Sequence, residues 1–248
     1  ISCISNESYS KEVETIEMLS NGSIDGFILS IAEETMVKNK FNHFEEIISN
    51  GTPIVMYDRV AEHVNCDKVV TDNFDSARST VTHLVKTGFR NIAFISTISN
   101  LEIGKRRNLG YLKGLEDHNI KVDKNLIINI DDDYKNYESI LEPILKNNKI
   151  DSVIATDESS AIAAMKVAIK LGHEIPKNFS AISFSNGILA RHSSPRMTTV
   201  SQHGEIMGAT AAEMLISRLE DKSEVKKKPE TVVVKTDLVE RNSTKNIL

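Results

Sequence analysis

Arg107 is the residue in this sequence best placed to do chemistry. The stretch 82–115 reads THLVKTGFRNIAFIS, then a polar loop, then RRNLGYLKGL. A helix is predicted to end at Gly88, because glycine takes the left-handed cap conformation, and a buried strand follows at 92–95. The next helix then opens with Arg107 in its first turn, just past the carboxyl end of a strand, where open α/β sheets bind ligands. A cation there opposes the helix macrodipole, so the sequence predicts that Arg107 holds a polar ligand; the alternative is a surface arginine beside Arg106.

The sequence contains no recognisable catalytic or metal-binding pattern. The nucleophile elbow, the phosphate-binding loop and the dinucleotide fingerprint are all missing, and the seven histidines show no paired metal spacing. Cys66 lies near His63, but a spacing of three residues in a loop is common by chance. The acidic run 131–133 is better interpreted as a solvated turn at a strand end than as a cation site. The sequence therefore predicts no enzyme, no metal ion and no cofactor.

Strand and helix patterns alternate along the chain, which predicts an α/β fold with parallel sheets covered on both faces. The expected strands are 1–5, 24–31, 53–57, 69–70, 92–96, 126–130, 152–155, 180–184, 197–200 and 231–234. The expected helices are 11–20, 41–50, 105–119, 134–148, 158–171 and 205–220. One more helix is expected to be capped by Asp75 and to end at Gly88, and the polar run 221–228 is expected to be a turn. An early and a later set of βα units indicate two similar lobes with a ligand cleft between them.

Composition places the chain among ordinary globular proteins. It has 248 residues, 40% hydrophobic and 26% charged, and no apolar run approaches the length of a membrane span. Its formal net charge of −5 disfavours binding of nucleic acid by this chain alone. Its cysteines, Cys3 and Cys66, have no framework spacing, which fits a reduced, cytoplasmic setting.

Many segments resemble the LacI/GalR family of bacterial transcription repressors. The family pattern HL-x-x-x-G-H-R-x-I-A-F-I followed by R-x-x-G-Y matches the stretch containing Arg107. Further matches, in the family's order, are IDGFIL, PIVMYDR, VTDN, DSVIATDESSAIAAMKVAIKLGHEIP, SPRMTTVSQ and the closing residues 238–244. One such match would be weak, but the ordered set is specific.

The resemblance implies two Rossmann-like lobes of the type I periplasmic-binding-protein class, joined by three hinge crossovers near Thr71, Ser201 and Lys235. The amino-terminal lobe is expected to comprise residues 1–71 and 202–234. The carboxyl-terminal lobe is expected to comprise residues 72–201 and 235–248. Family members also have a helix-turn-helix domain and a first βα unit ahead of the segment that this chain matches, so we expect an incomplete effector domain.

The resemblance also implies which residues contact the ligand. The expected contacts are Ser30, Asp58, Arg107, Tyr134, Asp157 and Ser185. Besides the surface alternative given above for Arg107, structural alternatives remain open for four of them: Ser30 could cap a strand end, and Asp58 could pair with Arg59. Tyr134 could pack at a helix edge, and Asp157 could cap the following helix.

Ser185 is the main departure from the family pattern. The family usually has an aspartate here that binds sugar hydroxyls, whereas this chain reads Ser183-Phe184-Ser185-Asn186. A hydroxyl is a weaker acceptor than a carboxylate and carries no charge. Either another carboxylate such as Asp157 substitutes, or the effector differs from a neutral sugar, and an anionic sugar derivative becomes a reasonable hypothesis.

The sequence thus predicts the effector-binding and dimerisation domain of a LacI-family transcription regulator. Its partners would be a sugar or sugar derivative, operator DNA through a helix-turn-helix absent from this chain, and a second copy of the chain in a homodimer, with no membrane. Two alternatives remain: a periplasmic sugar-binding protein, and a regulator that senses a partner protein instead of a sugar.

Overall fold

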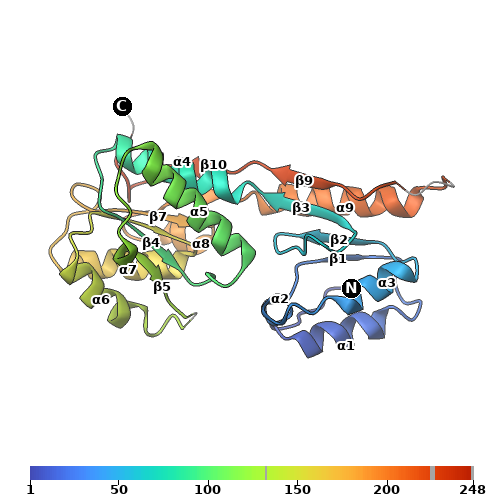
Figure 1. Cartoon of the computed structure of the whole chain (residues 1–248). Helices are drawn as coiled ribbons and strands as arrows, with labels where there is room; N and C mark the ends of the chain where they lie inside the picture. The colour runs from blue at the N-terminus through green and yellow to red at the C-terminus, as the bar shows by residue number, and fades with distance from the viewer. Residues whose placement is uncertain (132, 224–226, 247–248) are drawn as a thin grey trace. The chain divides into compact units, whose positions relative to one another are not determined.

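The computed structural model describes residues 1–131, 133–223 and 227–246, and the chain divides into two compact units, each an α/β structure (Figure 1). Unit 1 consists of Ile1–Thr71 and His203–Lys235. Unit 2 consists of Asp72–Gln202 and Thr236–Leu248. The chain therefore passes between the units three times, after Thr71, Gln202 and Lys235. Two α/β lobes with mostly parallel sheets confirm the predicted fold class.

Unit 1 is built on a four-stranded parallel sheet in the order β1-β2-β3-β9. Its strands are β1 (Phe27–Leu29), β2 (Ile54–Tyr57), β3 (Asp67–Thr71) and β9 (Thr231–Val234). Its helices are α1 (Tyr9–Leu19), α2 (Glu33–Lys38), α3 (Asn42–Ser49) and α9 (Gly204–Glu220). Because the strands are parallel, the residues that follow β1 and β2 lie at the same edge of the sheet.

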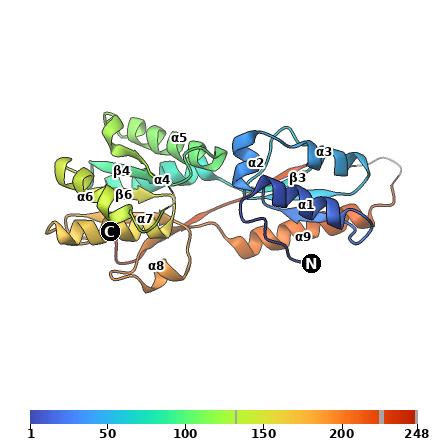
Figure 2. The same cartoon turned by 90° about the horizontal axis from the view of Figure 1, so that it is seen from below.

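Helices cover both faces of this sheet (Figure 2). Successive side chains of a strand point to opposite faces. Ile54 and Met56 of β2 accordingly pack into a core with α1 and α3, whereas Val55 between them packs with α9. Burial on both faces explains why the first three residues of β2 are all apolar, without alternation.

Unit 2 is built on a six-stranded sheet in the order β10-β8-β7-β6-β4-β5, in which only β10 is antiparallel to its neighbour. Its strands are β4 (Ile92–Ser96), β5 (Ile127–Asn129), β6 (Ser152–Ala155), β7 (Ser180–Phe184), β8 (Thr198–Ser201) and β10 (Asp237–Val239). Its α-helices are α4 (Asn73–Lys86), α5 (Glu102–Asp117), α6 (Tyr137–Asn147), α7 (Glu158–Lys170) and α8 (Ile188–His192). A 3₁₀ turn, Lys124–Leu126, leads into β5.

Two apolar cores enclose the sheet of unit 2. Ile154 and Phe184 lie in the core shared with α4 and α5, and Val153 and Ala155 lie in the core shared with α6 and α7. Tyr111 of α5 is fully buried in the first of these cores, where its hydroxyl donates to the carbonyl of Ile92 at 2.8 Å. Burial raises the pKa of the Tyr111 phenol, so this hydroxyl stays neutral and remains a hydrogen-bond donor.

Glycine ends helices where the sequence predicted it. Gly88 follows α4 with φ of +96°, and Gly172 follows α7 with φ of +91°. A side chain would strain this left-handed conformation, so these positions terminate their helices through backbone freedom.

Several local expectations are wrong. Residues 1–5 form no strand, and Ile1 and Ile4 are exposed; a strand needs a hydrogen-bonded neighbour, which a local pattern cannot supply. Asp72, not Asp75, is the N-cap residue of α4. The helices α5 and α6 begin at Glu102 and Tyr137, so Arg107 lies in the second turn of α5 and Tyr134 precedes α6.

Two short helices, α2 and α8, were not expected, because a helix of five or six residues is too short to show a periodic pattern. Parts of three expectations lie outside the described residues: Asp132 of the acidic run, 224–226 of the polar turn, and 247–248 at the end of the carboxyl-terminal lobe. Among the described residues, no helix is both long enough and apolar enough to cross a membrane.

Candidate ligand-binding site

A group of polar side chains follows the parallel strands of unit 2 at their shared carboxyl edge. We call it the carboxyl-edge cluster. Its members are Thr97 after β4, Thr156 and Asp157 after β6, Ser185 after β7, Gln202 after β8, and Arg107 from α5. Parallel strands bring these loops together although the residues are far apart in sequence.

Arg107 is the centre of the cluster and is 3% exposed. Its Nε donates to Asn73 Oδ1 at 2.8 Å, Nη1 to the carbonyl of Thr156 at 3.2 Å, and Nη2 to Gln202 Oε1 at 3.1 Å. The guanidinium carbon lies 4.1 Å from the centroid of the Phe184 ring. Four segments therefore fix the orientation of this cation before any ligand arrives.

This geometry changes the argument made from the sequence for Arg107. The residue is no surface arginine beside Arg106, and it does not oppose the dipole at the first turn of α5. It is held by neutral oxygens from β6, β8 and α4 and by the ring of a β7 residue. Position beside the strand ends, rather than beside the helix start, is what brings it to the site.

Asp157 is the N-cap residue of α7, which was the structural alternative to its role as a ligand contact. Its Oδ1 accepts from the Ser160 backbone N–H at 2.8 Å, and its Oδ2 accepts from Ser160 Oγ at 2.6 Å. Thr97 Oγ1 also donates to Oδ2, at 3.2 Å. A carboxylate has about four acceptor sites, so these three bonds leave capacity for one more donor.

Ser185 has a left-handed backbone, with φ of +95°, and its hydroxyl faces the carboxylate of Glu158 at 3.4 Å. Glu158 is buried and also accepts from the backbone N–H of Gly187 and, at 3.3 Å, of Ala190. A Cβ on Gly187 would lie 2.8 Å from Glu158 Oε1, so glycine lets the turn approach this carboxylate. Glu158, not Asp157, is therefore the carboxylate beside Ser185.

Glu158 was missed because an acidic residue in the first turn of a helix is ordinary. Tyr134 is 68% exposed and precedes α6, while Tyr137, three residues later, is the buried aromatic of that helix. The structure thus brings Arg107, Asp157 and Ser185 to one edge of a sheet and leaves Tyr134 on the surface of the same unit.

Ser30 and Asp58 lie at the carboxyl edge of the sheet in unit 1. Arg59 pairs with Glu7 at 2.7 Å and donates through Nε to Ser30 Oγ at 3.5 Å, so the alternative Asp58–Arg59 pair does not form. Asp58 has φ of +57°, and within the described part of the chain its carboxylate has no hydrogen-bond or ion-pair partner. A strained backbone that presents an unengaged carboxylate is typical of a binding position.

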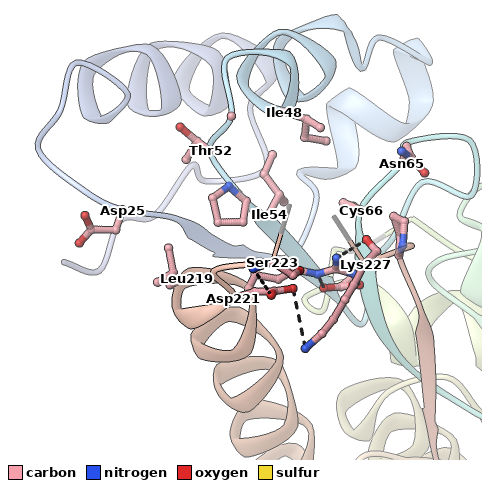
Figure 3. Close-up of a pocket in the computed structure, with 15 residues that line it drawn as sticks. Asp25, Ile48, Thr52, Ile54, Asn65, Cys66, Leu219, Asp221, Ser223 and Lys227 are labelled. Carbon is pink, nitrogen blue, oxygen red and sulfur yellow. Dashed lines mark hydrogen bonds and ion pairs between the residues drawn. The ribbon is translucent and has the colours of Figure 1, made fainter. Parts of the chain in front are cut away.

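A separate pocket of about 480 Å³ opens in unit 1 at the opposite, amino ends of the strands (Figure 3). Ile54 and Cys66 line it from the sheet, and Leu219 and Asp221 line it from the end of α9. Burial raises the pKa of the Cys66 thiol to about 11, so this cysteine stays protonated near neutral pH. Because a protonated thiol is a poor nucleophile, the structure does not support nucleophilic chemistry by Cys66 with His63 as its base.

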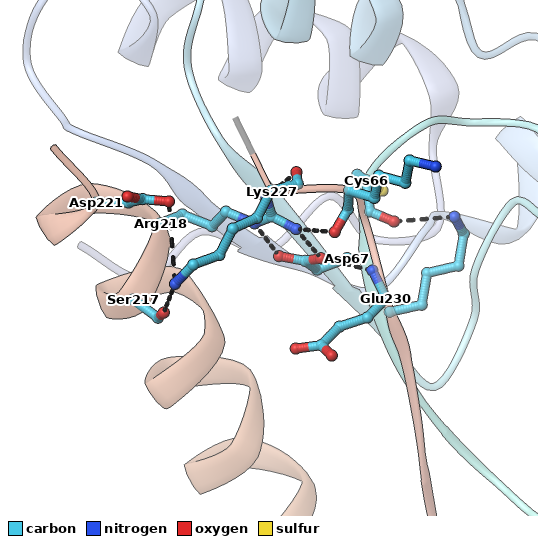
Figure 4. A network of polar contacts seen from close by, with 9 residues as sticks. Cys66, Asp67, Ser217, Arg218, Asp221, Lys227 and Glu230 are labelled. Atoms are coloured by element: carbon cyan, nitrogen blue, oxygen red, sulfur yellow. Dashed lines mark hydrogen bonds and ion pairs between the residues drawn. The ribbon is translucent and has the colours of Figure 1, made fainter. Parts of the chain in front are cut away.

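An ion-pair network closes one side of this pocket (Figure 4). Asp67, at the start of β3, accepts from Arg218 of α9 in a bidentate pair with both N···O distances at 2.7 Å. It also accepts from the Glu230 backbone N–H at 2.9 Å, and Arg218 donates to the carbonyl of Lys228 at 2.8 Å. The network fastens α9 and the segment before β9 onto β3, which is a structural role.

The described residues contain no group of three or more His, Cys, Asp or Glu side chains that could hold a metal ion. The acidic run at 131–133 is only partly described, and Asp131 and Asp133 are exposed. The chemistry available at the carboxyl-edge cluster is therefore hydrogen bonding and charge.

Comparison with known proteins decides the family. The model of the periplasmic binding protein-like domain matches residues 81–244, more than half of the chain. The chain belongs to this family. The HTH-type transcriptional repressor PurR of Yersinia pestis bv. Antiqua (strain Antiqua) is 28% identical over 244 residues, covering 98% of this chain and 70% of that protein. The predicted relationship to LacI-family regulators, over their effector-binding region, is confirmed.

Solved structures show the same fold. A complex of the transcriptional regulator CelR with cellobiose superposes with a TM-score of 0.80 at 24% identity, covering 95% of this chain and 71% of that one. The transcription regulator CcpA of Lactococcus lactis superposes with a TM-score of 0.82 at 22% identity, covering 98% of this chain and 86% of that one. Both proteins are described as transcription regulators, and the PurR relative as a transcriptional repressor.

Proposed function

We propose that this chain is the effector-binding and dimerisation domain of a LacI-family transcription regulator, and that its effector is a small carbohydrate-type molecule. Homology supports the class of protein. The buried guanidinium of Arg107, oriented in part by the carbonyl of Thr156 next to Asp157, is the observation that carries the ligand proposal.

The chemistry of the carboxyl-edge cluster suits a polyhydroxylated ligand. Each sugar hydroxyl both donates and accepts, so it needs donors and acceptors within one small area. Arg107 supplies a fixed donor group, and Asp157 and Thr97 supply oxygens. The bound cellobiose of CelR gives the same class of ligand in a protein of the same fold.

Binding would act on DNA through a conformational equilibrium. An effector shifts such an equilibrium only by the difference between its affinities for the two states. The helix-turn-helix domains of two copies would then change their spacing on a two-fold symmetric operator. Because a transcription regulator acts on DNA, the proposed location of the protein is the cytoplasm.

A thermal-shift screen tests the proposal. Neutral sugars, sugar phosphates and sugar acids are added to the purified protein, and saturating a true site stabilises the fold by about 2.7 kcal/mol at a hundredfold excess over Kd. Asp157→Asn is expected to weaken binding of any hit at least about tenfold, because the charge is lost while asparagine still caps α7. The effector proposal fails if a folded protein gives no shift with any compound.

Asp123→Asn is the matched control. Asp123 also caps a helical turn, through a 2.9 Å bond from the Asn125 N–H to its Oδ1, but it lies before β5, at the other end of the sheet. Its affinity for the same hit should equal that of the unaltered protein. Equal losses in both variants would show that capping, not ligand contact, is what the screen detects.

For homodimerisation we propose an apolar surface on unit 2 formed by Ile162 and Ile169 of α7 and Leu189 of α8, together with the buried side chain of Met165. These residues line a groove of about 300 Å³, and Ile169 and Leu189 are nearly half exposed. The Lys166–Glu138 and Lys170–Glu142 ion pairs lie on the same helix, so the charges beside the groove are already balanced. An apolar centre with a polar rim is the usual anatomy of a protein interface, and a second copy of the chain is its proposed occupant.

Leu189→Asp is expected to convert the dimer to a monomer, because a carboxylate would be buried without a partner in the interface. Sedimentation equilibrium measures the change directly. Val122→Asp places the same charge on another partly exposed apolar residue and should leave the dimer intact. A Leu189→Asp protein that remains fully dimeric would contradict the assignment of this surface.

A further inference from the structure

A second polar site lies in unit 2, around the segment that follows β10. A pocket of about 440 Å³ is lined there by Arg241, Asn242, Thr244 and Lys245, together with Pro176 and Pro195. Two of its lining residues are cations, and none of the described lining residues is acidic. Such a pocket concentrates positive charge on a chain whose net charge is −5.

Neutral groups hold both cations in place. Arg241 Nη1 donates to the carbonyl of Met197 at 2.7 Å and to Thr199 Oγ1 at 3.1 Å, and Nη2 donates to Asn186 Oδ1. The Lys245 ammonium lies 4.6 Å from the centroid of the Phe89 ring. These contacts orient the side chains but do not neutralise them.

Further arginines lie beside the pocket. Arg196 Nε donates to Asn242 Oδ1 at 3.2 Å, which brings its guanidinium to the pocket wall. Arg191 is on α8, whose Ala190 carbonyl accepts from the Met197 N–H at 3.0 Å. Burial lowers the pKa of Arg241, and Arg191 and Arg196 lower it further, with Glu158 acting in the opposite direction. Positive charges therefore face one another here at an energetic cost.

Other cations of unit 2 form ion pairs with carboxylates, unlike those described around this pocket. Arg78 pairs with Asp117, and Lys113 pairs with Glu116 at 2.8 Å and with Asp117 at 3.2 Å. Within the described ranges, no carboxylate forms an ion pair with Arg191, Arg196, Arg241 or Lys245. An anion with several acceptor oxygens would relieve the repulsion and accept from a guanidinium fork and an ammonium together.

We propose that the pocket lined by Arg241 and Lys245, with Arg196 at its wall, binds a phosphate group, either as inorganic phosphate or as a phosphate ester. The pocket shares none of its described lining residues with the carboxyl-edge cluster, so its occupant would be a second ligand. Phosphate fits better than a single carboxylate because it offers three or more oxygens and close to two negative charges to the two lining cations and to Arg196 beside them.

Phosphate titrations at constant ionic strength, set with sodium chloride, test the proposal on the purified chain. ³¹P line broadening reports inorganic phosphate directly, and methyl phosphate in a parallel titration distinguishes an ester from the free ion. We expect saturable binding, weakened at least about tenfold by Arg196→Gln and by Lys245→Gln, because each loses a charge-assisted bond. Arg241 is left unaltered, since it also supports Met197, Thr199 and Asn186.

Lys113→Gln is the control, because it removes the same charge from a lysine that is already paired on α5. Its phosphate affinity should match that of the unaltered protein. If the response is not saturable, or if all three variants bind alike, only general screening by the ion is present and the proposal is overturned. Acetate binding as tightly as phosphate would also overturn it. If either glutamine variant fails to fold, shifts of the Asn242 and Thr244 amide resonances with phosphate decide: shifts are expected, and their absence refutes the site.

Discussion

Replacing Arg107 by alanine is expected to lower the free energy of unfolding by about 3 kcal/mol and to abolish effector binding. The change leaves Asn73 Oδ1, the Thr156 carbonyl and Gln202 Oε1 without these donors in a buried region. It also removes the cation that stacks on the Phe184 ring. Urea unfolding followed by circular dichroism measures the stability, and the thermal-shift screen measures binding.

Arg106→Ala is the control, one position earlier in the same helix. Arg106 is exposed and pairs with Glu102 at 3.1 Å, one helical turn away. Such a surface pair contributes about 0.5 kcal/mol or less, so this variant should unfold almost as the unaltered protein does and bind the effector normally. Losses of equal size in the two variants would contradict the structural and ligand roles assigned to Arg107.

Arg107 also shows how far the sequence could be interpreted. Its place past the end of a strand predicted a cation near the ligand site, and that placement follows from local order along the chain. Its partners could not be predicted, because Asn73 and Gln202 come from segments 34 and 95 positions away that only the tertiary fold brings together. The expected position in the first turn was wrong because the preceding loop already turns into α5 at Glu102.

At Ser185 the departure from the family pattern could be seen in the sequence, but the neighbouring carboxylate could not. The missing aspartate was visible in the sequence, and Asp157 was one of the alternatives offered as a substitute, but its carboxylate is engaged by Ser160 and Thr97. The carboxylate beside Ser185 belongs to Glu158, 27 positions earlier in the chain, with the rest of α7 and β7 between them. A contact of this kind has no local periodicity, and an acidic residue in a first turn gives no signal of its own.

Strands were easier to predict than helix ends. The expected strands 92–96, 152–155 and 180–184 match the structure residue by residue, because apolar runs buried on both faces are unambiguous between polar loops. The expected strand 231–234 also matches, although most of its residues are not buried. The start of α6 was placed three residues early, at Tyr134, because the aromatic pattern cannot tell an exposed tyrosine from the buried Tyr137. The ligand contacts expected at Ser30, Asp58, Tyr134, Asp157 and Ser185 stay predictions.

Replacing Gly110 by alanine is expected to destabilise the protein by about 3 kcal/mol, although alanine is the better helix former. A Cβ at Gly110 of α5 would lie 2.1 Å from the carbonyl oxygen of Phe74 and 3.0 Å from Ala77 Cβ, both on α4. Because the nearest atom belongs to the backbone, no rotamer change can relieve the overlap, and the two helices must separate. The core that they share with Tyr111 and Phe184 would then lose contacts on both sides.

Gly208→Ala provides the same substitution with the opposite expectation. Gly208 lies inside α9, and a Cβ there would meet nothing within 4 Å. The variant should therefore gain roughly 0.5–1 kcal/mol, because alanine loses less backbone entropy than glycine when a helix forms. Urea unfolding of both variants measures the two signs in one experiment. If Gly110→Ala is as stable as the unaltered protein, α4 and α5 do not approach as closely as the structure shows. The glycine of the R-x-x-G-Y segment would then have a role other than close helix packing.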